Sequence, residues 1–290
     1  MSKPNSITLE DIVSRTSDLP TFSAAALEVM RMADSSTSRA QDIARIVSQD
    51  QAMSVRVLRL ANSAFYGMSR KVSSLPEAVV VLGMRTVKNL AMVAATYPWM
   101  SKPLKGYDLA PMQMWHHSFG TALAAQTLAA RTRKCDDQLA FTSGLLHDVG
   151  KVALSLWIGE KLKAIVYYAE REGMPFDEAE RRILGYDHTE VGEHLGKNWN
   201  LPEEVLLGIR WHHEPESCEP YHPVADCVHL GSTISMAMGI GLGGDGLHYT
   251  FSEGCYSRLG LRPDDTDSIS ADYVDAFKKY ETMFAAMAAA

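Results

Sequence analysis

The chain has 290 residues, of which 46% are hydrophobic and 22% are charged, and its formal net charge at pH 7 is -7. These fractions are typical of a globular protein, and the length permits one large core or two smaller ones. The negative charge disfavours broad binding to nucleic-acid phosphates, which requires clustered Lys and Arg, so we expect no DNA or RNA partner.

We also expect neither an export signal nor a membrane span. The first residues, Met-Ser-Lys-Pro-Asn-Ser, are polar, and the longest apolar run, Ala78 to Leu82, is too short to cross a bilayer. Four cysteines are scattered without a C-x-x-C pair, which favours reduced, packed thiols over a disulfide framework. They are Cys135, Cys218, Cys227 and Cys255. These features together predict a cytoplasmic protein.

Helical periodicity dominates the first hundred residues. Apolar residues at helical spacing predict helices over 21–33, 42–47, 53–61 and 85–96. Another helix is expected to open at Pro76, where the missing N–H costs nothing. Within 53–61 the expected buried face contains Val57, Leu58 and Leu60, and Asn62-Ser63 interrupts it. The proline- and glycine-containing segment 102–111 predicts a connector, and we place a domain boundary there.

The second half is also expected to be helical. An Ala- and Gly-rich helix is predicted over 114–131, followed by a helix pair over 139–156 that bends near Gly150. Asp187 is the expected N-cap of a helix that begins at His188, and Leu201-Pro202 precedes a helix that ends near His212-His213. Further helices are expected over 226–238 and from about Ser270 onward.

This pattern predicts an all-α protein with two helical lobes, because no strand-type alternation is long enough to indicate a sheet. The expected segments are an N-terminal helical lobe over 1–101, a second helical lobe over 112–238, and a glycine-rich loop with a C-terminal helix over 239–290. The loop contains Gly239-Ile240-Gly241-Leu242-Gly243-Gly244. It fits G-x-G-x-x-G, but no βαβ unit surrounds it, so a flexible loop is the better interpretation.

The adjacent pair His147-Asp148, followed by Gly150 and Lys151, is the strongest chemical signal in the sequence. Further candidate ligands occur along the chain, and imidazole and carboxylate together suit Zn, Mn, Fe or Co. The candidate metal ligands are His117, His147, Asp148, His188, His212, His213 and Asp226. We expect a divalent metal, Fe, Mn or Zn, with one or two ions bound.

Each of these residues also has a simpler interpretation. A single buried histidine more often forms a hydrogen bond to a carbonyl, Asp226 could be an N-cap, and Lys151 could be a solvated helix residue. The occurrence of seven candidate ligands in one chain favours a metal site over seven unrelated structural roles.

The same residues resemble the ligand series of the HD superfamily of metal-dependent phosphohydrolases. Leu146-His147-Asp148-Val149-Gly150-Lys151 resembles its core motif, and Trp211-His212-His213-Glu214 resembles the double-histidine motif of the HD-GYP type. The chain departs from that type in two places. No Gly-Tyr-Pro follows His213, and Gln113 stands where an acidic residue is expected one turn before the first histidine.

Over about residues 14 to 235 the chain is more similar to the HDOD family, the HD-related output domain. The segments that carry this similarity occur in the family's order. They are Leu19-Pro20, Val47-Ser48-Gln49-Asp50, Leu58 to Ser63, Ala78 to Gly83, and Trp115-His116-His117-Ser118. The resemblance implies that the second lobe is an HD-like helical bundle. It also implies a bacterial signalling or output module with a signalling protein as partner.

Two functions therefore remain open. In the first, the chain is an output module that keeps a metal site. In the second, it is a metal-dependent phosphohydrolase or phosphodiesterase for a nucleotide or a cyclic dinucleotide, with Asp148 and Lys151 as catalytic residues. In that second hypothesis Asp148 bridges two metals, a metal-bound hydroxide attacks phosphorus, and Lys151 neutralises the phosphate. A basic cluster of Arg56, Arg59, Arg70 and Lys71 is either a solvated face or a contact for an acidic partner surface.

Overall fold

A computed structural model of the protein describes residues 9, 12, 22–32, 40–63, 66–68, 70–159, 161–245, 249–262 and 264–288. In this part of the chain the regular elements are all helical, and an isolated antiparallel bridge joins Leu104 and Leu109. The prediction of an all-α protein is confirmed.

The chain forms two compact units, and both are discontinuous in sequence. Unit 1 contains residues 1–21 and 99–269, and unit 2 contains residues 22–98 and 270–290. The division falls within two long helices, α6 (Met84–Met100) and α16 (Asp265–Ala288). The three segments expected from sequence, 1–101, 112–238 and 239–290, stay a prediction.

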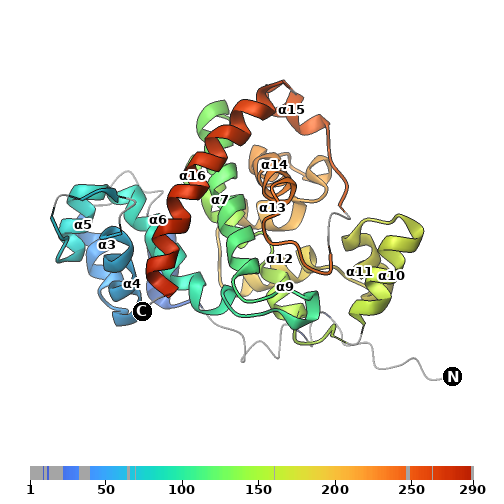
Figure 1. The fold of residues 1–290 in the computed structure, drawn as a ribbon, viewed down its shortest axis with the longest axis horizontal. Coiled ribbons are helices and arrows are strands. Elements are labelled where there is room, and N and C mark those ends of the chain that lie inside the picture. The colour runs from blue at the N-terminus through green and yellow to red at the C-terminus, as the bar shows by residue number, and fades with distance from the viewer. Residues whose placement is uncertain are drawn as a thin grey trace. The chain divides into compact units, whose positions relative to one another are not determined.

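Among the described residues of unit 2, four short α-helices accompany its parts of α6 and α16 (Figure 1). They are α2 (Ala24–Met32), α3 (Ala40–Val47), α4 (Gln51–Ala61) and α5 (Leu75–Leu82). Val57 and Leu60 are fully buried on α4, as predicted, whereas Leu58, also expected on the buried face, is only half-buried. Asn62 ends α4 because its side-chain Nδ2 donates to Leu58 O and Val72 O, while Val72 N donates to its Oδ1. Pro76 lies in the first turn of α5, as expected.

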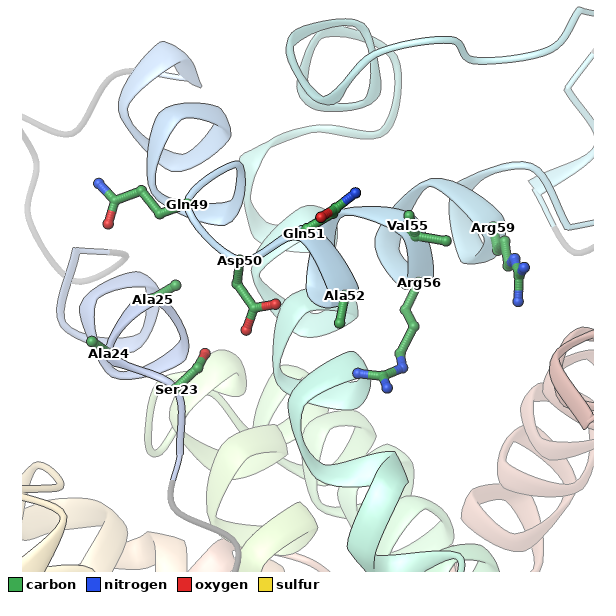
Figure 2. Close-up of a pocket in the computed structure, with 10 residues that line it drawn as sticks. All are labelled: Ser23, Ala24, Ala25, Gln49, Asp50, Gln51, Ala52, Val55, Arg56 and Arg59. Carbon is green, nitrogen blue, oxygen red and sulfur yellow. The ribbon is translucent and has the colours of Figure 1, made fainter.

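A hollow of about 880 Å³ opens on this unit between the start of α2 and the exposed side of α4. Figure 2 shows Asp50, Val55, Arg56 and Arg59 among its lining residues. Asp50 caps α4 by accepting a hydrogen bond from Met53 N, so its carboxylate is already partnered. Arg56 Nη1 likewise donates to Ala94 O at 3.3 Å, and the two arginines outnumber the single carboxylate, so the hollow carries a net positive charge.

Unit 1 is built around the buried helix α7 (Gln113–Thr132), which packs against α8 (Asp137–Leu146) and α14 (Pro223–Ala237) (Figure 1). Two glycines allow these close approaches. A Cβ on Gly144 of α8 would lie 2.8 Å from Ala122 Cα, and a Cβ on Gly231 of α14 would lie 2.9 Å from Thr121 O. Any side chain at either glycine would push the helices apart.

The break between α8 and α9 (Val149–Leu154) lies at His147-Asp148, two to three residues before Gly150, near which the sequence predicts a bend. Gly150 is instead a helical residue of α9 that meets α12 (His188–Asn198). A Cβ at Gly150 would lie 1.8 Å from His188 O, so this glycine is required for helix packing rather than for a bend.

Most remaining helices of unit 1 match the expected ones. Asp187 caps α12 in a full capping box with Glu190, and α13 (Glu203–Trp211) ends at the double histidine, as predicted. No prediction was made for three further helices. They are α10 (Leu162–Glu172), α11 (Phe176–Leu184) and α15 (Gly254–Leu259).

Candidate metal centre

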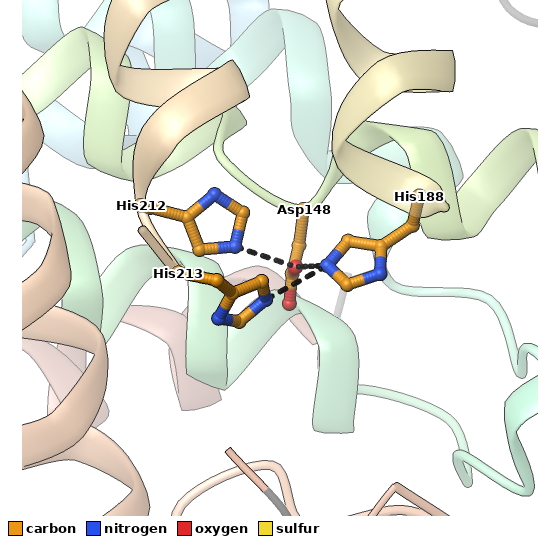
Figure 3. Close-up of side chains that lie close together, drawn as sticks. All are labelled: Asp148, His188, His212 and His213. Atoms are coloured by element: carbon orange, nitrogen blue, oxygen red, sulfur yellow. Dashed lines mark hydrogen bonds and ion pairs between the residues drawn. The ribbon is translucent and has the colours of Figure 1, made fainter. Parts of the chain in front are cut away.

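The candidate centre is assembled from helix ends. His147 and Asp148 form the junction between α8 and α9, and His188 is the first residue of α12. His212 and His213 directly follow α13. Helix termini leave backbone groups without intrahelical partners, so the polar side chains there are held by local bonds while they project inward. Figure 3 shows three of the histidines directed toward the Asp148 carboxylate.

Asp148 belongs to two groups of ligand atoms that lie within 4.8 Å of one another. Its Oδ1 lies 3.4 Å from His188 Nε2 and 3.6 Å from His212 Nε2. His213 joins this first group, with its Nε2 3.0 Å from His188 Nε2.

The second group lies on the other carboxylate oxygen. Asp148 Oδ2 is 3.4 Å from His147 Nε2 and 3.7 Å from His117 Nε2, and these two nitrogens are 3.3 Å apart. One carboxylate therefore faces four histidine rings directly, which is the arrangement of a bridging ligand between two cation positions.

The outer nitrogen of three of these rings is held by an acceptor. These Nδ1 contacts are from His147 to Gly144 O (2.8 Å), from His212 to Ile209 O (2.8 Å) and from His188 to Glu180 Oε2 (2.6 Å). Because a carbonyl or carboxylate only accepts, each Nδ1 carries the proton and donates it, and Nε2 faces the centre. Metal-binding histidines are held in this way by a hydrogen bond from their second nitrogen.

Some inward-facing acceptors have no hydrogen-bond partner. Among the described residues, neither His212 Nε2 nor Asp148 Oδ1 has one, and both are buried. Two facing acceptors repel unless a cation lies between them, and leaving such groups unsatisfied is costly. The cluster therefore fits a divalent cation, by the identity of its donors as well as by their orientation.

The protonation states agree with this interpretation. Burial lowers the pKa of His147 and His213 well below its usual value, and it lowers the pKa of His117 and His212 as well. Burial alone would raise the pKa of Asp148, but His147 and Lys151 hold it well below its usual value. Four of the five histidines of the centre are therefore neutral imidazoles beside an ionised carboxylate, the forms that bind metal, whereas Glu180 raises the pKa of the fifth, His188, against the effect of burial.

Lys151 is buried and bound to two carboxylates, not solvated. Its Nζ lies 2.9 Å from Asp148 Oδ2 and 2.8 Å from Asp245 Oδ2. Burial opposes the charge, but these two carboxylates raise the pKa of Lys151 above its usual value. The lysine therefore compensates the negative charge of the centre.

Asp245 and Tyr249, which sequence reasoning missed, cover this side of the centre. Tyr249 donates its hydroxyl to Asp245 Oδ2 at 2.8 Å, and its ring stacks on His213 with a centroid distance of 4.3 Å. Both lie in or next to the glycine-rich loop. Gly241 explains part of that composition, because its φ is +72° and a Cβ there would lie 2.4 Å from His117 Cβ.

Asp226 is the one candidate ligand that the structure does not bring into the cluster. Its carboxylate is buried and accepts bonds from Arg258 Nε (3.0 Å) and Nη2 (2.6 Å) and from the Tyr221 hydroxyl (2.7 Å). The residue of α14 that reaches the cluster is Ser232, whose Oγ lies 3.4 Å from His117 Nε2. In this structure α14 therefore meets the cluster through Ser232 rather than through Asp226.

A cavity of about 180 Å³ adjoins the centre. His212 and His213 form one wall, and Tyr249 and Phe251 are among the other lining residues. This volume is below the roughly 300–1,000 Å³ of sites that take drug-sized ligands.

An all-helical unit with a His-Asp pair at a helix junction, surrounded by further histidines, is the architecture expected of an HD-type protein. The sequence comparison is more specific: the HDOD domain matches residues 19–215. The chain belongs to the HDOD domain family.

One curated relative shares most of this chain's length. The chain is 30% identical over 221 residues to an uncharacterized protein of Treponema pallidum (strain Nichols), which covers 75% of this chain and 42% of that protein. The chain thus spans less than half of that relative.

Solved structures are similar over nearly the whole chain. An HDOD domain protein of unknown function from Geobacter sulfurreducens is 26% identical, with a TM-score of 0.74 and 96% of both chains covered. A protein from Shewanella amazonensis SB2B whose assignment as a phosphohydrolase is provisional is 25% identical, with a TM-score of 0.71; the match covers 95% of this chain and 97% of that one. A protein from Marinobacter aquaeolei VT8 whose assignment to signal transduction is provisional is 25% identical, with a TM-score of 0.77; the match covers 95% of this chain and 61% of that one.

None of the described helices combines the length and apolar character that a membrane span requires.

Proposed function

We propose that the protein is a signalling output module, and that a metal ion bound at the His/Asp centre stabilises its HD-like unit. The observation that carries this proposal is the enclosure of the centre. His147 and His188 are fully buried, Asp148 is 1% exposed, and Lys151 already occupies its Oδ2. A nucleotide or cyclic dinucleotide would need more room than the adjoining cavity of about 180 Å³. The similarity to a provisional signal transduction protein supports the same function.

We further propose that the hollow of unit 2 receives an acidic segment of a partner protein. Arg56 and Arg59 line it, and Val55, which is 45% exposed, offers an apolar contact beside them. A segment that pairs carboxylates with an apolar side chain complements this surface in charge and character. Its volume of about 880 Å³ is sufficient for several side chains.

Binding of a labelled acidic peptide, measured by fluorescence anisotropy, tests the docking surface. We expect binding that weakens with salt and falls at least tenfold in Arg56→Glu and Arg59→Glu. Lys71→Glu is the matched control, because Lys71 is exposed in the same unit and does not line the hollow. Equal losses in all three variants would show a general charge effect and would contradict the assignment of the hollow.

The metal is proposed to be Fe, Mn or Zn, with one or two ions bound. Elemental analysis of protein purified without chelator should find a near-stoichiometric metal that is lost in His147→Ala and Asp148→Ala. His194→Ala is a matched control, because His194 lies on α12 outside the cluster and contacts Glu190 O. Metal below about a tenth of an equivalent in every preparation would refute the centre.

A second candidate function, a metal-dependent phosphohydrolase, is favoured by the contact of the small cavity with His212 and His213. A bound divalent metal can lower the pKa of its water to about 7. In this chain Asp148 would hold the metal, and the cavity would admit a phosphate group. Turnover of a phosphodiester or nucleotide by the metal-loaded protein, abolished in Asp148→Asn, would replace the module proposal with this one. We expect no turnover.

A further inference from the structure

Two cysteines that are distant in sequence meet in unit 1. Cys135 lies in the bend between α7 and α8, and Cys227 lies near the start of α14. Their Sγ atoms are 3.9 Å apart, and both thiols are free. The two cysteines are 92 positions apart, and the sequence indicated only scattered and packed thiols.

The two thiols differ in exposure and acidity. Cys135 is half-buried, so it is the more exposed residue of the pair, whereas Cys227 is fully buried. The hydrogen bond between them lowers the pKa of Cys135 and, together with burial, raises the pKa of Cys227 well above its usual value. Cys135 is therefore the thiol that ionises and reacts first, because the thiolate is the nucleophile.

A covalent bond requires the two sulfur atoms to move closer together. A disulfide requires a sulfur–sulfur distance of about 2.05 Å, so the two atoms must approach by about 2 Å. Cys135 can supply this movement, because it lies outside the helices, in the bend that ends at Asp136, the N-cap of α8. The partner Cys227 is held within α14.

We propose that Cys135 and Cys227 are a peroxide-sensitive pair that forms an intramolecular disulfide. The Cys135 thiolate attacks one oxygen of a hydroperoxide, the O–O bond breaks, and hydroxide or alkoxide leaves to take up a proton. The sulfenic acid formed on Cys135 is then attacked by Cys227 sulfur, the S–O bond breaks, and water leaves with the Cys227 proton. The two thiols together supply the two electrons that reduce the peroxide.

The bond would join the α7–α8 bend to α14. His117 lies on α7, the His147-Asp148 pair directly follows α8, and Ser232 lies on α14. The cross-link would therefore fix helices that surround the centre. The pair itself needs neither a bound metal nor a signalling partner, so this proposal stands apart from the proposed function.

The test uses the full chain, reduced and then treated with a small excess of hydrogen peroxide. Remaining thiols are alkylated, and the non-reduced digest is mapped by mass spectrometry. We expect a Cys135–Cys227 link, with the loss of two hydrogens, as the main product. The Cys218→Ser/Cys255→Ser double variant should form the same link, whereas Cys227→Ser should instead accumulate a sulfenic acid on Cys135 that dimedone traps.

A parallel oxidation in denaturant makes the test independent of how the variants fold. The native protein should prefer the Cys135–Cys227 link at least tenfold over links to Cys218 or Cys255, and this preference should disappear in the unfolded chain. A dimedone-trapped Cys135 without the link in the native wild type would overturn the proposal. A native link through another cysteine, or between two chains, would overturn it equally.

Discussion

Replacing Asp226 with Asn distinguishes a structural carboxylate from a metal ligand. The buried Asp226 carboxylate accepts charge-assisted bonds from Arg258 Nε and Nη2 and a third from Tyr221. A hydrogen bond to a charged group contributes about 1.5–3 kcal/mol. The amide keeps one acceptor oxygen but turns its NH₂ group toward a donor, so about half of the Arg258 interaction should be lost. We expect Asp226→Asn to reduce the free energy of unfolding by about 3 kcal/mol.

Urea denaturation followed by tryptophan fluorescence measures this loss, and the metal content is determined on the same samples. A loss of about 3 kcal/mol should lower the urea midpoint by on the order of 1 M. The exposed Asp264→Asn is the control and should stay within about 0.5 kcal/mol of wild type. Arg258→Met should add little to Asp226→Asn in a double-mutant cycle, because both remove the same pair.

The outcome that refutes this reasoning is also specific. If Asp226→Asn loses metal as fully as His147→Ala while the unfolding midpoints of the two metal-free proteins, Asp226→Asn and wild type, are equal, Asp226 is a ligand and its pairing with Arg258 is not a stabilising interaction. Retained metal with a lowered midpoint is the expected result.

Three other predictions concern the centre itself. Lys151→Met removes the cation between Asp148 and Asp245, so the free energy of unfolding of the metal-free protein should fall by about 3–5 kcal/mol. A denaturant titration measures this loss, and an unchanged midpoint would show that the buried lysine does not stabilise the fold. Gly150→Ala places a Cβ 1.8 Å from His188 O, so we expect the free energy of unfolding to fall by about 3 kcal/mol or more and the metal to be lost. Gly159→Ala is the control and should have neither effect, because a Cβ at Gly159 meets no atom within 4 Å. In the metal-free protein the lowered histidine pKa values, chiefly those of His147 and His213, mean that the unfolded chain binds more protons below about pH 6.5. This part of the stability is present above about pH 6.5 and is lost as the pH falls toward the lowered values, whereas His188, whose pKa is raised, acts in the opposite sense. Because four of the five histidines have lowered pKa values, the urea midpoint should drop as the pH falls below about 6.5, and a midpoint that does not drop would contradict the assigned burial.

Helix type and order could be predicted because apolar spacing and capping residues are local signals. The helices around Pro76, Asp187 and the double histidine show this clearly. The position of the α8–α9 break could not, because Gly150 is required by the carbonyl of His188, a residue 38 positions later in the sequence. A glycine selected for close packing and a glycine selected for a bend look the same in a single sequence.

The candidate ligands were recognised by residue type, and six of the seven converge. The position of Asp226 outside the cluster could not be predicted, because residue type does not reveal which side of α14 faces the cluster. Its partner Arg258 lies 32 residues away in the sequence. Asp245 and Tyr249 were missed for a different reason. They belong to a glycine-rich segment without periodicity, where only the folded chain shows that a carboxylate lies against Lys151.

The contact between His188 and Glu180 has a consequence for how a cation would enter the centre. Glu180 is fully buried and accepts bonds from the His188 backbone N, His188 Nδ1 and the Tyr107 hydroxyl. Although burial acts against it, this carboxylate raises the pKa of His188, unlike that of its neighbours. Below that pKa the inner nitrogen of His188 carries a proton, which an incoming cation must expel. Loading would then acidify an unbuffered solution, and affinity would fall with acidity, so the centre would work as an exchanger of protons for metal.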